Sequence, residues 1–113
     1  EDVVEEMPGR KVVYSGDTAK CQNMIDHAED ADLLIHEATC LHEMIEDRRG
    51  HTSALQAGEI AKEASVQKLV LTHFSRRYRN NEEVLLQEAS EEFEAVELAE
   101  DGKKFEVNPH RPE

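Results

Sequence analysis

The sequence has little cysteine and no long hydrophobic run, and each absence excludes a class of protein. Its two cysteines, Cys21 and Cys40, lack the C-x-x-C spacing typical of a zinc knuckle or a redox motif. We expect both to be reduced, small apolar residues beside the strands. No apolar run approaches the roughly 20 residues that a membrane helix needs, and no signal-peptide pattern opens the chain. We therefore expect a cytoplasmic protein that does not enter a membrane.

Basic side chains are also scarce. The 113 residues include 13 Lys and Arg against 26 Asp and Glu, a formal net charge of −13. The length fits one domain or a part of a larger one. A charge of this sign repels RNA at long range. If the protein binds nucleic acid, either its basic surface lies elsewhere or the acidity is a solubility adaptation such as life in high salt. We favour a mixture of the two.

What the sequence does contain is an alternation of short apolar runs and helical patterns. The runs predict strands over residues 11–14, 32–36, 68–72, 95–98 and 104–107. The helical patterns cover residues 21–29, 53–65 and 82–93, with Thr52 or Ser53 as a cap of the second. Residues 1–10 are predicted to be a linker and residues 108–113 a disordered tail. This order predicts an α/β fold with a mainly parallel sheet.

Four short polar motifs follow the predicted strands or lie in the loops after them. They are Ser15-Gly-Asp-Thr18, His36-Glu-Ala-Thr39, Gly50-His-Thr-Ser53 and His73-Phe-Ser-Arg-Arg-Tyr78. In parallel sheets, ligands gather at the carboxyl ends of the strands. We therefore expect these motifs to form one site.

Two residues of the motifs are candidate metal ligands. Asp17 follows a strand and a glycine, where a carboxylate can bridge two divalent cations in a site for phosphodiester hydrolysis. His73 closes a strand, and imidazole is the commonest nitrogen ligand of zinc. Each residue has a plainer alternative when it is considered alone. Asp17 could form an Asx-turn or cap a helix, and His73 could be an ordinary hydrogen-bonded residue.

Glu37 and His51 are a candidate acid–base pair. The segment 38–50 is long enough to fold back and bring His51 against the strand end that carries Glu37. A carboxylate that orients and charges an imidazole makes a general acid near neutral pH, which a departing 3′ oxygen of RNA requires. The alternative is that Glu37 caps a helix and His51 is a loop histidine. We expect His36 to serve packing, and His27 and His42 to take no part in the site.

Arginines are concentrated at the end of the fourth motif. The guanidinium of Arg77 suits a phosphate in a bidentate contact. Arg76 and Arg79 could be ordinary surface charges, but with Arg77 they form a local positive island in an acidic chain.

Taken in order, the four motifs resemble those of the ribonuclease Z branch of the metallo-β-lactamase superfamily. That branch carries S-G-D-T, H-E-A-T, H-S-T and H-F-S-x-R-Y in its later half, and the resemblance covers about residues 11–107. Here His51 is followed by Thr-Ser rather than Ser-Thr. The resemblance implies a zinc-dependent endoribonuclease that removes the 3′ trailer of precursor tRNA. It also implies that the chain is the C-terminal half of an αββα sandwich.

The resemblance further implies roles for individual residues. Asp17 would bridge two Zn²⁺ ions, for which Mn²⁺ could substitute, and His73 would bind one of them. Glu37 and His51 would protonate the leaving group. Three residues, Arg77, Ser75 and Tyr78, would lie along the phosphate path. The implied partners are precursor tRNA, the missing N-terminal half and, in the complete enzyme, a second copy of the protein.

The sequence lacks the H-x-H-x-D-H segment that supplies most metal ligands in this family, and it contains no His-x-His. We therefore expect weak metal binding and little tRNA processing from this chain alone. Two other functions remain open. The chain could be a non-catalytic relic or interaction half-domain, or it could belong to another hydrolase of the same fold.

Overall fold

In the computed structural model of the protein, residues 3–7, 10–15, 22–47 and 51–99 are described. They form five strands, three α-helices and two 3₁₀ helices. The strands are β1 (Val3–Met7), β2 (Arg10–Tyr14), β3 (Leu33–Glu37), β4 (Leu69–Thr72) and β5 (Val96–Leu98). The α-helices are α1 (Gln22–Ala28), α2 (Ala54–Ala64) and α3 (Glu83–Ser90), and the 3₁₀ helices are η1 (His42–Asp47) and η2 (Arg76–Tyr78).

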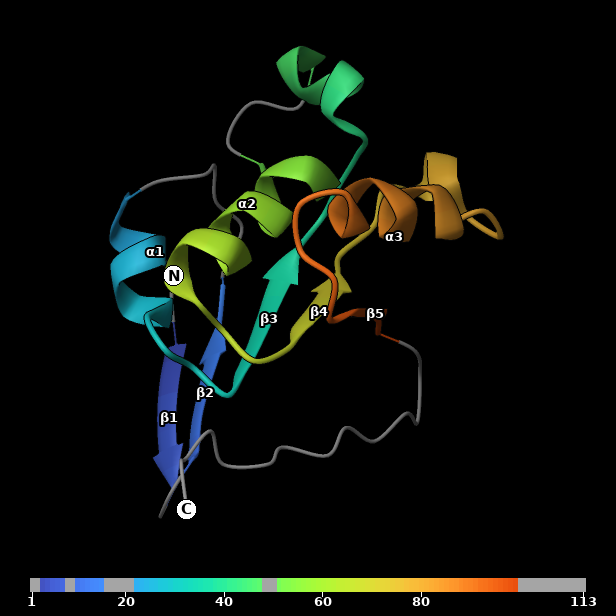
Figure 1. The fold of residues 1–113 in the computed structure, drawn as a ribbon. Helices are drawn as coiled ribbons and strands as arrows, with labels where there is room; N and C mark the ends of the chain where they lie inside the picture. The colour runs from blue at the N-terminus through green and yellow to red at the C-terminus, as the bar shows by residue number, and fades with distance from the viewer. Residues whose placement is uncertain (1–2, 8–9, 16–21, 48–50, 100–113) are drawn as a thin grey trace.

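The strands form one sheet in the order β1-β2-β3-β4-β5. β1 is antiparallel to β2, and the other neighbouring pairs are parallel. Figure 1 shows β2, β3 and β4 pointing toward the same edge of the sheet. Parallel strands need crossover connections, which the helices supply. The predicted α/β fold with a mainly parallel sheet is confirmed.

The three α-helices cover one face of this sheet (Figure 1). α2 contacts β3 and β4, while α1 packs beside α2, and α3 contacts both α2 and β5. The strands alternate apolar residues toward the helices, where Val13, Leu34, Leu69 and Leu71 are fully buried. The main core of the described chain therefore lies between the sheet and the helices.

The segment before α2 is fixed by a capping box. The Ser53 side chain accepts from the Gln56 N–H, and the Gln56 side chain accepts from the Ser53 N–H. These contacts satisfy donors that have no partner inside the helix. Of the two caps that the sequence allows, the structure therefore uses Ser53.

The structure differs from the predicted linker at residues 3–7, which form β1. This segment has no clear period of its own, but its backbone pairs with β2 from Val3↔Tyr14 to Met7↔Arg10. Strand formation here depends on the partner edge, which local patterning does not reveal. The two 3₁₀ helices were also not predicted, because such short turns carry little periodicity. The other strands and helices agree with the prediction within a few residues. The predicted strand over 104–107 and tail over 108–113 lie outside the described residues.

None of the helices in the described part of the chain combines the length and apolarity that crossing a membrane requires.

Four described residues other than glycine have a left-handed backbone: Asp30, Ser65, His73 and Asn80. Ser65 ends α2 in this conformation, with its N–H bonded to the last turn. His73, with φ of 61°, follows the last residue of β4 and turns the chain out of the sheet. Its side chain is exposed.

Gly58 allows α2 and α3 to approach closely, and we expect Gly58→Ala to destabilise the protein. A Cβ at this position would lie 2.7 Å from the main-chain oxygen of Ala89. Alanine favours a helix by about 1 kcal/mol over glycine, but overpacking costs about 1–3 kcal/mol. We expect a net loss of up to about 2 kcal/mol in the free energy of unfolding, measured in urea. Gln87→Ala, at an exposed position of α3, is the control and should change little. An unchanged or raised urea midpoint for Gly58→Ala would contradict the close approach.

We expect His73→Gly to be tolerated, in contrast to the same change at Thr72. A left-handed backbone costs a non-glycine residue about 1–2 kcal/mol. Glycine avoids that cost, although it loses about 0.5–1 kcal/mol through its greater freedom in the unfolded chain. His73→Gly should therefore keep or slightly raise the free energy of unfolding. Thr72→Gly, in β4, should lower it by roughly 1 kcal/mol. Equal losses in both variants, measured by urea unfolding, would show that His73 is not strained.

Candidate active site

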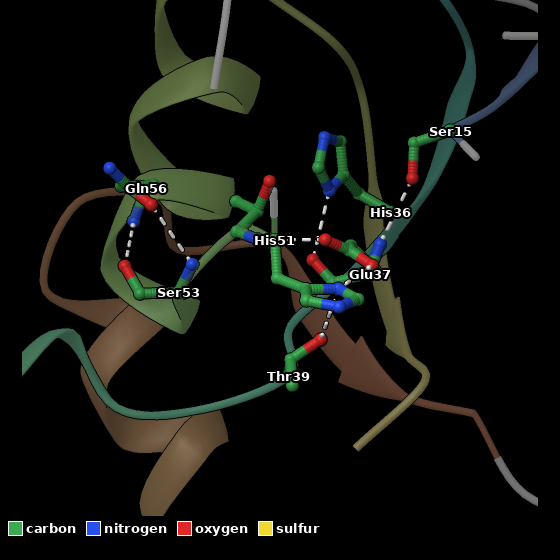
Figure 2. A network of polar contacts seen from close by, with 8 residues as sticks. Ser15, His36, Glu37, Thr39, His51, Ser53 and Gln56 are labelled. Atoms are coloured by element: carbon green, nitrogen blue, oxygen red, sulfur yellow. Dashed lines mark hydrogen bonds and ion pairs between the residues drawn. The ribbon is translucent and has the colours of Figure 1, made fainter. Parts of the chain in front are cut away.

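Glu37, the last residue of β3, connects several segments at the carboxyl edge of the sheet. Its N–H donates to Ser15 Oγ over 3.0 Å, and its Oε1 accepts from the Thr52 N–H over 2.7 Å. His36 Nδ1 lies 2.9 Å from the main-chain oxygen of Glu37. Figure 2 shows Ser15 and His36 beside Glu37. The side chain is only 2% exposed, so its position is set by these protein contacts.

The second carboxylate oxygen of Glu37 contacts His51. Glu37 Oε2 lies 3.2 Å from His51 Nδ1, and the His51 side chain is 36% exposed. A carboxylate can only accept, so Nδ1 carries the proton in this contact. This leaves Nε2 as the ring nitrogen for a substrate. The predicted contact between Glu37 and His51 is present, and Glu37 ends a strand and does not cap a helix.

Main-chain hydrogen bonds like those between parallel strands place His51 beside Glu37. The Thr39 N–H donates to the Thr52 oxygen, and the Ala54 N–H donates to the Cys40 oxygen. Cys40 and Ser53 form an isolated parallel bridge. The chain between them contains η1, a turn that the sequence pattern did not predict. Thr39 Oγ1 also lies 3.5 Å from His51 Nδ1.

The end of β4 lies beside the end of β3. Glu37 pairs with Thr72 in the sheet register, and the Ala38 N–H donates to the Thr72 oxygen. His73 therefore follows directly at the edge that carries Glu37. The Ser75 N–H then donates to the Thr39 oxygen, which ties the fourth motif to the second.

The three predicted phosphate-binding residues have different environments. Arg77 is exposed in η2, and Ser75 caps this turn by accepting from the Arg77 N–H over 3.3 Å. Tyr78 is only 5% exposed, and its hydroxyl accepts from the Leu41 N–H over 3.1 Å. The tyrosine thus packs in the core beneath the turn. Of the three, Arg77 has the most accessible side chain.

The predicted metal ligands are only partly described. Asp17 lies outside the described residues. Among residues 3–7, 10–15, 22–47 and 51–99, no three His, Cys, Asp or Glu side chains gather as a metal site. Zinc in proteins usually has four ligands. The described residues alone therefore do not form a metal centre.

Sequence reasoning missed two polar residues of this region. The Ser15 hydroxyl accepts from the Glu37 N–H, a contact that its place in the first motif does not predict. His42 was expected to take no part, but its Nδ1 lies 3.0 Å from Ser53 Oγ, at the cap of α2. Its position eleven residues before Ser53 gave no periodic signal. His36 is fully buried, as expected for a packing residue.

Comparison with known proteins places this arrangement in a family. The model of the β-lactamase superfamily domain matches residues 3–74. Ribonuclease Z of Methanosarcina acetivorans is 45% identical over 108 residues, which are 94% of this chain and 35% of that protein. Ribonuclease Z of Brevibacillus brevis is 46% identical, over 96% of this chain and 36% of that protein. The chain thus spans about a third of the length of these relatives.

Solved structures give the same result. Human tRNase Z, short form, superposes with a TM-score of 0.67 at 32% identity, covering 95% of this chain and 37% of that one. The metallo-β-lactamase fold protein YhfI from Bacillus subtilis gives a TM-score of 0.74 at 35% identity, over 83% of this chain and 39% of that one. The resemblance inferred from the four motifs is confirmed. With a family match that covers more than half of its residues, the chain belongs to the β-lactamase superfamily.

Proposed function

We propose that this chain is the C-terminal part of a ribonuclease Z-type endoribonuclease that removes the 3′ trailer of precursor tRNA. The observation that carries the proposal is the contact between the buried Glu37 carboxylate and the partly exposed His51. A buried carboxylate that orients a partly exposed imidazole suits proton transfer to a substrate at the protein surface. The similarity to proteins named ribonuclease Z supports tRNA as the substrate class.

In the proposed reaction His51 is the general acid. Glu37 Oε2 accepts from Nδ1 and fixes the ring. In the imidazolium form both ring nitrogens carry a proton, so Nε2 can give its proton to the departing 3′ oxygen and leave a neutral imidazole that is still protonated at Nδ1. Glu37 is held in turn by the Thr52 N–H, whatever the state of the imidazole. Burial keeps the carboxylate oriented, and the exposure of His51 gives a substrate access.

The substrate phosphate is proposed to bind beside this pair. Arg77 is exposed on η2, and Ser75 connects that turn to Thr39 next to Glu37. A guanidinium binds phosphate through two parallel hydrogen bonds. Ser75 and Tyr78 then act mainly by holding the turn, since Ser75 caps it and Tyr78 is buried under it.

Metal dependence is expected for this family. We propose Zn²⁺ as the metal, with Mn²⁺ as a possible substitute and with Asp17 and His73 as two of its ligands. The remaining ligands would come from a part of the protein that carries an H-x-H-x-D-H segment.

The proposed partners are that missing N-terminal half, precursor tRNA and a second copy in the complete enzyme, acting in the cytoplasm. The greater length of the relatives is consistent with a further half. The sheet face opposite the helices also supports it. Leu33 and Val70 on this face are already buried, but Tyr14 is 36% exposed there and its neighbours Val12 and Ile35 are only partly buried. A second layer of the fold would bury these apolar side chains.

The first test is cleavage of a precursor tRNA by the 113-residue chain with Zn²⁺ or Mn²⁺, with and without a polypeptide that carries the H-x-H-x-D-H segment. We expect cleavage at the 3′ trailer only when both polypeptides are present, because this sequence lacks the H-x-H-x-D-H segment that would supply the remaining metal ligands. Asp17→Ala is the control and should abolish the activity. No cleavage in any mixture would favour a non-catalytic half-domain. Hydrolysis of a small ester without tRNA cleavage would favour another hydrolase of the same fold.

The second test is a double-mutant cycle on the active mixture, which contains this chain and the polypeptide with the H-x-H-x-D-H segment. Glu37→Gln and His51→Gln should each lower kcat by about 10²–10⁴-fold, the usual contribution of a general acid. The double variant should be little worse than either single variant, since both changes disable one proton donor. His27→Gln, on the exposed side of α1, is the matched histidine control. Additive losses would show that the two residues do not act as a pair.

A further inference from the structure

A carboxylate outside the four motifs lies at the base of the segment that carries His51. Glu88, on α3, accepts with one oxygen, Oε1, from two main-chain N–H groups. These are the N–H of His42 at 2.9 Å and the N–H of Leu55 at 2.9 Å. The two donors are 13 positions apart in the sequence, and His51 lies between them.

We propose that Glu88 is a positioning residue that fixes both ends of the segment 42–55 on α3 and thereby holds His51 against Glu37. This inference rests on the proposed function, because it concerns the same proton donor. Glu88 itself has no place in the transfer of the proton. Its part is to keep the imidazole where Glu37 can orient it.

One carboxylate can hold both ends of the segment because each donor lies at the start of a helix. His42 begins η1 and Leu55 lies in the first turn of α2. The N–H groups at the start of a helix have no partner inside it, and the helix dipole favours a negative charge there. Glu88 satisfies one such group from each helix. A hydrogen bond to an ionised acceptor is also stronger than a neutral one.

Other contacts reinforce this junction without replacing it. His42 Nδ1 lies 3.0 Å from Ser53 Oγ, so the two ends of the segment also touch through side chains. Leu55 is only three positions after Thr52, whose N–H donates to Glu37 Oε1. Displacement of the start of α2 would therefore be transmitted directly to Thr52 and His51.

A helix cap with no further role would also stabilise the protein, so the test must report on the His51 ring. We would record imidazole ¹H–¹⁵N correlation spectra of the 113-residue chain and assign His51 by its loss in His51→Gln. Glu37→Gln supplies the reference for a ring that has lost its carboxylate partner. In Glu88→Ala we expect the His51 Nδ1 and Nε2 resonances to move most of the way to that reference. Glu83→Ala, which removes the same charge from an exposed position of α3, should leave them in place.

Two conservative variants keep the proposal open to refutation if Glu88→Ala does not fold. Glu88→Gln retains an acceptor oxygen at the same reach and should leave the His51 resonances close to those of the unmodified chain. Glu88→Asp keeps the charge, but its side chain is shorter by one methylene and should not reach both donors, so it should displace the resonances. Unchanged His51 resonances in a folded Glu88→Ala or Glu88→Asp variant would overturn the proposal.

The spectra need no substrate, metal or second polypeptide. If the chain is not a ribonuclease, Glu88 can still be shown to position His51. In the form that cleaves, Glu88→Ala should lower kcat with little change in KM, and Glu88→Gln should recover most of the loss. A fall in activity without any change at His51 would assign Glu88 another role and reject this one.

Discussion

The buried carboxylate of Glu37 is the constraint on which the rest of the site depends. A charged group taken out of water is costly unless it is paired and hydrogen-bonded. Here the group is 2% exposed and receives the Thr52 N–H and the His51 ring on its two oxygens. The end of β3 and the segment before α2 therefore cannot separate without leaving this carboxylate unsatisfied.

The main chain of Glu37 extends the same constraint to the neighbouring strand. Its N–H donates to Ser15 Oγ just beyond β2, while the following residue, Ala38, donates to Thr72 at the end of β4. Three parallel strands thus end in mutual register around one residue. The site is placed on rigid elements, and the exposed imidazole is the part that meets solvent.

Much of this arrangement could be predicted from local patterns. The apolar runs at β2, β3 and β4 and the Ala-rich α2 are consistent with their tertiary setting, so propensity and packing agree. The contact between Glu37 and His51 could also be predicted, because functional groups gather at the carboxyl ends of parallel strands and the segment 38–50 is long enough to fold back. β1 could not be predicted, because its strand character comes from pairing with β2.

Two further features could not be predicted, because both depend on contacts between segments that are far apart in the sequence. Glu88 binds backbone groups 46 and 33 positions away in the sequence, and a contact to main-chain N–H groups leaves no signature in the side chains it serves. The burial of Tyr78 is similar, since its hydroxyl bonds the Leu41 N–H from a distant segment. Local patterns identify which side chains could do chemistry, whereas long-range backbone contacts decide which side chains hold them in place.

The negative net charge of the chain is compatible with the proposed RNA substrate, because salt screens the repulsion between charges that are far apart. A net charge of −13 acts at long range, but at physiological salt the Debye length is about 8 Å, so separated charges are strongly screened. Arg76 and Arg77 in η2 and Arg79 at its C-cap are all exposed, so three positive charges belong to one turn. These arginines can thus bind a phosphate at short range, although the net negative charge of the whole chain does not attract one. If RNA is the substrate, as we propose, its long-range attraction would have to come from a part of the protein outside this chain.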